Sequence, residues 1–140
     1  MRPSSSLLLA WSASLLPQAL AAGQKGFALG SVIGSATTCK ATSDYENDFD
    51  AIKSASGSTI VRIYAASQCD TAKNILPAAQ KKGFKVVLGV WPDTEESLKA
   101  DKAALQQYVP QYPDQVYAVT VGSETLYRGN FTGTESRNRR

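Results

Sequence analysis

The sequence contains no histidine and only two cysteines, and these scarcities exclude several kinds of site. Without an imidazole there is no Ser-His-Asp triad and no histidine-ligated metal. Two cysteines are too few to form a structural zinc site by themselves. Any catalysis therefore has to come from carboxylates, hydroxyls, lysine or tyrosine, and we expect neither a metal nor a cofactor.

Net charge is also small. The 140 residues carry fifteen Lys and Arg against twelve Asp and Glu, and 43% of them are hydrophobic, as in one globular domain. The basic excess comes from the two ends of the chain, because residues 23–133 hold eleven charges of each sign. This neutral body lacks the clustered basic charge of a nucleic-acid-binding protein, so we expect no nucleic-acid partner.

Residues 1–22 have the pattern of a secretory signal peptide. Arg2 precedes a short apolar run at 7–11, and Ala19-Leu20-Ala21 forms a small-residue cleavage site. Polar residues and a proline interrupt the run, which is therefore too short to cross a bilayer. The alternative is a buried N-terminal helix. Because no later stretch has spanning length, we expect a secreted, extracellular protein without a membrane span.

Export favours a disulfide between Cys39 and Cys69, with two separate buried thiols as the alternative. Such a bridge would close a loop of thirty residues and stabilise the fold by roughly 3.5 kcal/mol in the chain-entropy account. Asn130-Phe131-Thr132 is an acceptor sequence for N-glycosylation, which a secreted chain can use.

Short apolar segments alternate with amphipathic segments from residue 25 onward. Strands are predicted at 26–33, 59–64, 85–91 and 116–121, about thirty residues apart. Two of the intervening helices are predicted to begin with capping boxes, Ser43-x-x-Glu46 and Asp93-x-x-Glu96. Pro77 is expected to delay or kink the second helix.

This alternation predicts an α/β protein with a parallel sheet and helices outside it. Four β/α units fit either an open sheet or half of an eight-stranded barrel. Residues 30–34 lack the G-x-G-x-x-G spacing, so no dinucleotide site is expected. The first and last strands would be open edges, through which the chain could self-associate. Residues 134–140 contain no apolar side chain and form either a solvated terminus or a point where the chain stops mid-fold.

Four residues fall where predicted strands end and loops begin, the usual place for catalytic groups in parallel barrels: Tyr64, Trp91, Pro92 and Glu124. Aromatic rings beside a carboxylate suit a sugar, and glycoside hydrolysis needs two carboxyl groups across the scissile bond. The alternatives are ordinary core packing for the two rings and a solvated position just past a strand for Glu124.

An ordered set of motifs resembles fungal glycoside hydrolase family 17, the β-1,3-glucanases and glucanosyltransferases of the cell wall. These motifs are Arg62-Ile-Tyr64, Gly89-Val-Trp91-Pro92 and the segment 121–130 around Glu124. The resemblance runs from about Lys25 to Gly133. It implies a (β/α)8 TIM barrel of which about the first four units are present, so that residues 23–133 are the N-terminal half of the hydrolase barrel.

The resemblance also implies roles for individual residues. Glu124 would be the general acid/base of a retaining mechanism, while the nucleophilic carboxylate would belong to the second half of the barrel, absent from this sequence. Tyr64, Trp91, Ser123 and Tyr127 would bind the sugar. Residues 134–140, where the resemblance ends, are interpreted as a polar tail produced by a truncated gene model or a retained intron.

The expected function is that of a secreted cell-wall enzyme acting on β-1,3-glucan, inactive in this partial form. Hydrolysis at chain ends, hydrolysis within chains and glucanosyl transfer remain open. The alternative, from a different class, is a non-catalytic glucan-binding or structural protein of the cell wall, which would keep the aromatic residues and lack turnover.

Overall fold

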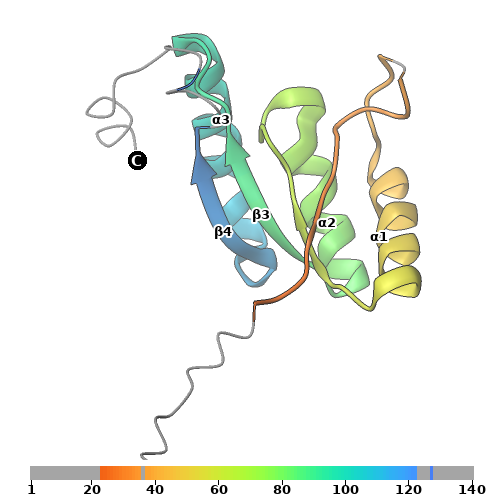
Figure 1. Ribbon diagram of the computed structural model, residues 1–140. Helices are drawn as coiled ribbons and strands as arrows, with labels where there is room; N and C mark the ends of the chain where they lie inside the picture. The colour runs from red at the N-terminus through yellow and green to blue at the C-terminus, as the bar shows by residue number, and fades with distance from the viewer. Residues whose placement is uncertain (1–22, 36, 123–126, 128–140) are drawn as a thin grey trace, which may run out of the picture.

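Four parallel strands in the order β1-β2-β3-β4 form the sheet of the computed structural model (Figure 1), which describes residues 23–35, 37–122 and 127. The strands are β1 Phe27–Ala28, β2 Ile60–Arg62, β3 Lys85–Val90 and β4 Val116–Val121, and the helices are α1 Thr42–Ser56, α2 Thr71–Lys82 and α3 Glu95–Tyr108. Short 3-10 turns span 68–70, 109–111 and 113–115. The predicted alternation of strands and helices is therefore confirmed.

The first strand is much shorter than predicted. Only Phe27 and Ala28 pair with β2, whereas the prediction ran over 26–33. Beyond them, Val32 forms an isolated antiparallel bridge with Cys39, and Gly34 takes a positive φ of 58° between these two residues. The apolar run therefore folds back on itself because a loop, and not a neighbouring strand, supplies its later hydrogen bonds.

The core lies between the sheet and the helices. Val61 of β2, Ile63 just after it, and Val86 and Leu88 of β3 follow an alternating pattern and are at most 1% exposed. Phe49 of α1 stacks on Phe84 at a centroid distance of 4.3 Å. The period-two burial of the strands against one helical layer is the arrangement of a β/α barrel wall.

Both predicted capping boxes are displaced. The first helix begins one residue after Ala41, whose N–H donates to the Asp44 carboxylate at 2.8 Å. The third begins after Thr94, whose hydroxyl accepts from the Ser97 N–H, while the Ser97 hydroxyl accepts from the Thr94 N–H. Thr94 and Ser97 therefore form the capping box of the third helix, one residue later than the predicted Asp93-x-x-Glu96 box.

Pro77 neither delays nor breaks the second helix, which continues from Thr71 to Lys82. Burial explains this outcome, because Ile75, Leu76, Ala78 and Ala79 around the proline are all fully buried. Packing of these side chains outweighs the loss of one helical hydrogen bond, which tertiary context commonly does.

Cys39 and Cys69 form the predicted disulfide, so the alternative of two separate thiols is wrong. The bridge joins the loop before α1 to the turn before α2. Both loops leave the carboxyl ends of strands, so the covalent link lies at the edge of the sheet where a barrel builds its site.

Among the described residues, no helix is both long enough and apolar enough to span a bilayer. The predicted signal peptide, the 134–140 tail and Asn130 lie outside these residues and remain predictions.

Candidate functional site

Two aromatic side chains stand at the carboxyl ends of neighbouring strands. Tyr64 follows β2 and is 40% exposed, and Trp91 directly follows β3 and is half-buried. Their rings meet edge to face at a centroid distance of 6.3 Å and an interplanar angle of 70°. The Arg62 guanidinium lies 5.0 Å from the centroid of the Tyr64 ring. The exposed fraction of Tyr64 excludes ordinary core packing for this ring.

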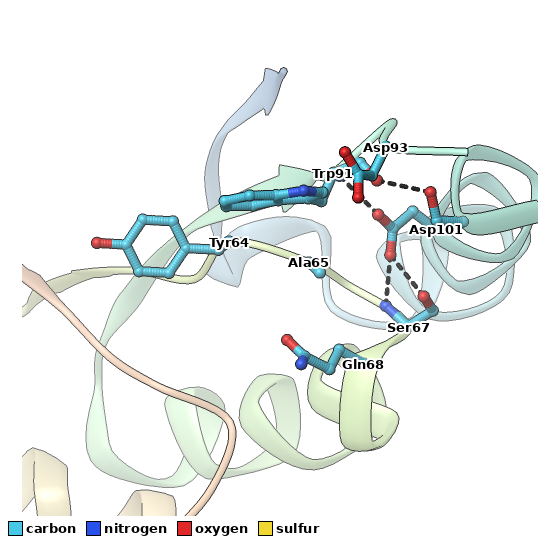
Figure 2. A pocket seen from close by; sticks show the side chains of 8 residues that line it. Tyr64, Ala65, Ser67, Gln68, Trp91, Asp93 and Asp101 are labelled. Atoms are coloured by element: carbon cyan, nitrogen blue, oxygen red, sulfur yellow. Dashed lines mark hydrogen bonds between the residues drawn. The ribbon is translucent and has the colours of Figure 1, made fainter. Parts of the chain in front are cut away.

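The two rings border a hollow of about 610 Å³ (Figure 2). Ala65, Ser67 and Gln68 come from the chain after β2, while Asp93, Ser97 and Asp101 come from the turn after β3 and from α3. The hollow therefore has an aromatic side and a polar side. That combination suits a sugar, whose C–H faces stack on rings while its hydroxyls seek hydrogen bonds.

Asp101 is the buried charge of this site, only 1% exposed. One carboxylate oxygen accepts hydrogen bonds from the backbone N–H of Ser67 at 2.7 Å and from its hydroxyl at 2.6 Å (Figure 2). The other oxygen accepts from the backbone N–H of Trp91 at 2.7 Å. The Ser97 hydroxyl donates to the Trp91 carbonyl at 2.9 Å. Side chains of α3 therefore fix the peptide of Trp91 on both sides.

Gly89 allows the chain after β2 to cross over β3. A Cβ added at Gly89 would lie 2.2 Å from the Tyr64 carbonyl oxygen and 2.5 Å from that of Ile63. The Ala66 N–H donates to the Gly89 carbonyl at 2.9 Å, so the two segments are also hydrogen-bonded. The glycine of the Gly-x-Trp-Pro motif is thus required by close backbone approach, and it places Tyr64 beside Trp91.

A buried hydrogen-bond chain reaches the hollow from α1. The Tyr45 hydroxyl donates to the Thr71 hydroxyl at 3.4 Å, and Thr71 donates to the Gln68 carbonyl at 2.5 Å. Burial raises the pKa of Tyr45 above its ordinary value, although the hydrogen bond to Thr71 opposes this and nearby Asp48 and Asp44 add to it. Tyr45 is therefore neutral at physiological pH and serves as a fixed donor.

The predicted site residues divide into two groups. Tyr64 and Trp91 are brought together at the hollow, whereas Tyr127 is 89% exposed and is not among the residues that line it. Ser123 and Glu124 lie outside the described residues. Gly122 directly precedes them, and its N–H donates to the Val90 carbonyl at 3.0 Å, so the chain leaves β4 at the same sheet edge that carries Trp91.

Sequence reasoning missed Asp101, Ser67 and Gln68. A usable pattern existed for Asp101, because it continues the helical series of Leu98 and Leu105 at spacings of three and four residues. A carboxylate in an apolar stripe indicates a buried partner set. Ser67 and Gln68 carry no comparable pattern, since their position depends on where the chain turns after β2.

No cluster of residues able to hold a metal is present within the described part of the chain. Two of the four acidic residues of α1 instead pair with lysines of α2: Glu46 with Lys81 at 2.6 Å and Asp50 with Lys82 at 2.5 Å. These carboxylates join α1 to α2 on the outside of the sheet.

Comparison with known proteins agrees with this geometry. The BtgE/BtgC glycoside hydrolase domain matches residues 26–139. The chain is 58% identical over 136 residues to a glucan 1,3-beta-glucosidase of Arthroderma benhamiae, covering 96% of this chain and 42% of that protein. It is 44% identical over 119 residues to a glucan 1,3-beta-glucosidase of Saccharomyces cerevisiae, covering 84% of this chain and 37% of that protein.

The fold is similar to that of a glycoside hydrolase family 17 beta-1,3-glucanosyltransferase from Rhizomucor miehei. The TM-score is 0.72 with 29% sequence identity, over 83% of this chain and 42% of that chain. An active-site mutant of the Rhizomucor enzyme in complex with laminaritriose gives a TM-score of 0.71. The predicted partial (β/α)8 barrel is therefore confirmed.

The chain spans about two-fifths of the length of these relatives. The family match covers residues 26–139. That range includes the four parallel strands and the motifs at Arg62–Tyr64 and Gly89–Pro92. The chain therefore belongs to the BtgE/BtgC glycoside hydrolase family and has the family 17 fold that its motifs predict.

Proposed function

We propose that this chain is part of a retaining enzyme that hydrolyses or transfers β-1,3-glucan, and that the hollow beside Tyr64 and Trp91 binds the sugar. The observation that carries the proposal is the edge-to-face aromatic pair at the carboxyl ends of β2 and β3, bordering a hollow with a polar opposite side. The relatives' names, glucan 1,3-beta-glucosidase and beta-1,3-glucanosyltransferase, support the substrate class.

In this proposal Glu124 is the general acid/base. It gives its proton to the glycosidic oxygen as that bond breaks, while a second carboxylate attacks the anomeric carbon and forms a covalent glycosyl intermediate. Glu124 then takes a proton from water in hydrolysis, or from a sugar hydroxyl in transfer, as the new bond forms. Ser123 and Tyr127 flank this residue in sequence and would contribute to the sugar subsites.

Within the described residues, the carboxylates that line the hollow are Asp93 and Asp101. Asp101 is buried and already accepts three hydrogen bonds, and Asp93 lies in the turn just before α3, where a carboxylate meets the helix dipole. Neither is assigned as the second carboxylate. We therefore expect the chain as given to bind laminari-oligosaccharides without cleaving them.

The experiment measures reducing-end release from laminari-oligosaccharides by a chain of the relatives' length, carrying either Glu124 or Glu124→Gln. The substitution should reduce kcat by about 10²- to 10⁴-fold, the usual contribution of a general acid. Glu96→Gln is the matched control, because Glu96 is an exposed glutamate at the start of α3. An unchanged rate in Glu124→Gln would refute the assignment.

The competing candidate is a non-catalytic glucan-binding protein of the cell wall. The observation that favours it is that the aromatic pair is complete within the described residues, whereas the carboxylates that line the hollow there are Asp93, in the turn before α3, and the hydrogen-bonded Asp101. Oligosaccharide binding by a chain of the relatives' length, with no release of reducing ends, would establish this candidate in place of the enzyme.

We also propose that the protein is secreted to the cell wall, which the 1–22 leader pattern and the Cys39–Cys69 bridge support. N-terminal sequencing of protein from the culture medium should find a start between residues 22 and 24. A start at Met1, or retention inside the cell, would contradict this.

Self-association through the sheet edges is the remaining part of the proposal. Within the described sheet, β1 and β4 are the end strands, and Tyr117 and Val119 of β4 are 57% and 45% exposed. Open edges and exposed apolar side chains favour association of copies of this chain. Light scattering should show a mass above 15.0 kDa that falls on dilution.

A further inference from the structure

The carboxylate of Asp101 is buried in an unusual way, because it neutralises no cation. Within the described residues it forms no ion pair, and its three hydrogen-bond donors are neutral groups from two other parts of the chain. Removing a charge from water without an opposite charge is costly, so an apolar side chain would fill this position of α3 at lower free energy. Core packing alone therefore does not explain an aspartate here.

The donors show what the carboxylate accomplishes. Ser67 lies three residues after Tyr64. The other donor is the backbone N–H of Trp91, the second aromatic residue itself. One oxygen accepts only from Ser67 and the other only from Trp91, so the planar carboxylate bridges the two segments that carry the rings (Figure 2). Hydrogen bonds to an ionised acceptor are short and strong, which fixes the spacing of these segments.

We propose that Asp101 is a positioning residue that holds Tyr64 and Trp91 at the separation and angle needed to bind glucan. This inference rests on the proposed function, since it takes the aromatic hollow as the sugar-binding site. Although Asp101 borders the hollow, its side chain is only 1% exposed and both oxygens accept hydrogen bonds from the chain, so in this inference it acts through the two rings and not by contact with the substrate. Its effect is to keep the site preorganised, so that binding does not have to order two loops.

Asp101→Asn is the direct test. The amide keeps the size of the side chain but offers one acceptor oxygen instead of two, and its NH2 group faces an N–H or O–H donor. One of the two segments must therefore detach. We expect affinity for laminari-oligosaccharides, measured by calorimetry on the chain as given, to fall at least tenfold.

Ser67→Ala provides a milder variant in case Asp101→Asn does not fold. It removes the hydroxyl contact at 2.6 Å and leaves the backbone N–H contact, so affinity should fall about threefold, the size of one modest net hydrogen bond. In the double variant Ser67→Ala should add little to Asp101→Asn, because both act through the same carboxylate.

Ser58→Ala is the matched control for a purely structural effect. The Ser58 hydroxyl is also a buried donor, to the Lys25 carbonyl at 2.5 Å, but it lies at the opposite end of β2. This variant should lower the thermal midpoint while leaving oligosaccharide affinity unchanged. A loss of affinity in Ser58→Ala equal to that in Ser67→Ala would overturn the positioning role.

A second readout does not depend on the sugar. In a Trp11→Phe background Trp91 is the sole tryptophan. Asp101→Asn should shift its emission to longer wavelength and increase quenching by acrylamide, and Ser58→Ala should do neither. If the unsubstituted chain fails to bind glucan, the proposed function fails, but this fluorescence comparison still tests positioning. Unchanged Trp91 emission and quenching in Asp101→Asn would overturn the inference.

Discussion

Ser58 and Ser67 are two serines beyond opposite ends of β2, and each donates its hydroxyl to an acceptor from a distant part of the chain. At the amino end Ser58 contacts the Lys25 carbonyl, and at the carboxyl end Ser67 contacts the Asp101 carboxylate. The amino-end bond joins the Ser58 hydroxyl to the backbone of another segment, and its other partner is the backbone N–H of Ile60. The carboxyl-end bond enters a network that continues to Trp91.

The spaces at these two ends differ as well. The amino-end hollow is about 280 Å³ and is lined by residues 24, 25 and 56–60, none of them aromatic, whereas the carboxyl-end hollow is about 610 Å³ and is bordered by Tyr64 and Trp91. A serine hydroxyl bond therefore joins two segments of the fold at the amino end of β2, and at the carboxyl end it helps to position the aromatic hollow. This is the division of labour expected of a parallel barrel, in which stability and function occupy opposite faces.

The largest expected effect is that of Gly89→Ala at the carboxyl end. The new methyl group would overlap the Tyr64 carbonyl, which belongs to backbone and cannot rotate away. We expect a loss of about 4 kcal/mol or more in the free energy of unfolding, in the range reserved for severe core strain. Urea denaturation measures this loss. Gly30→Ala is the control, since a Cβ there meets nothing within 4 Å; equal stability of both variants would contradict the packing account.

Removal of the Cys39–Cys69 bridge should have the next largest effect. Because the two cysteines are thirty positions apart in sequence, reduction should lower the free energy of unfolding by roughly 3.5 kcal/mol. Because Cys69 adjoins Gln68 at the hollow, the affinity for oligosaccharides should fall as well. Denaturation curves with and without reductant test the first part, and the Cys39→Ser/Cys69→Ser double variant controls for effects of the reductant. Coinciding curves would contradict the prediction.

Ser58→Ala should cost about 1 kcal/mol, the net value of a typical buried hydrogen bond, without affecting the carboxyl end. Its hydroxyl also accepts from the Ile60 N–H at 3.3 Å, so the β2 start should loosen. Hydrogen exchange at Ile60 should accelerate while exchange at Trp91 stays constant. Faster exchange at Trp91 would show that the two ends are coupled, and would weaken the distinction between them.

The smallest effect concerns Tyr45 and appears only in alkali. Burial raises the pKa of Tyr45 in the folded state above its value in the unfolded chain. The contribution of neutral Tyr45 to the free energy of unfolding is therefore fully present below about pH 10. Above that pH the unfolded state releases the proton first, and the free energy of unfolding declines. Tyr45→Phe should decline less steeply between about pH 9 and 11 in urea titrations. Parallel declines would show that other groups cause the loss.

Local pattern predicted the elements well where one face of the element is buried. β3 was predicted almost to the residue, because its apolar run lies against the helices. β4 was also predicted from its apolar run, although none of its residues is buried. The prediction failed for β1, where the apolar run continues past the point at which a neighbouring strand is available. Helix starts failed by one or two residues, since several Ser, Thr and Asp side chains in a row can each cap a helix.

The sequence by itself determined the alternation of strands and helices, the pairing of its two cysteines and the two aromatic residues at strand ends. Period-two and helical spacing are local properties, and two cysteines allow only one intramolecular bridge. Only the tertiary structure decided that Asp101 joins the segments of Tyr64 and Trp91, and that the carbonyls just after β2 occupy the space where a side chain at Gly89 would lie. Those contacts depend on how α3 and the segment after β2 pack in space. The spacing of these residues along the sequence carries no information about that packing.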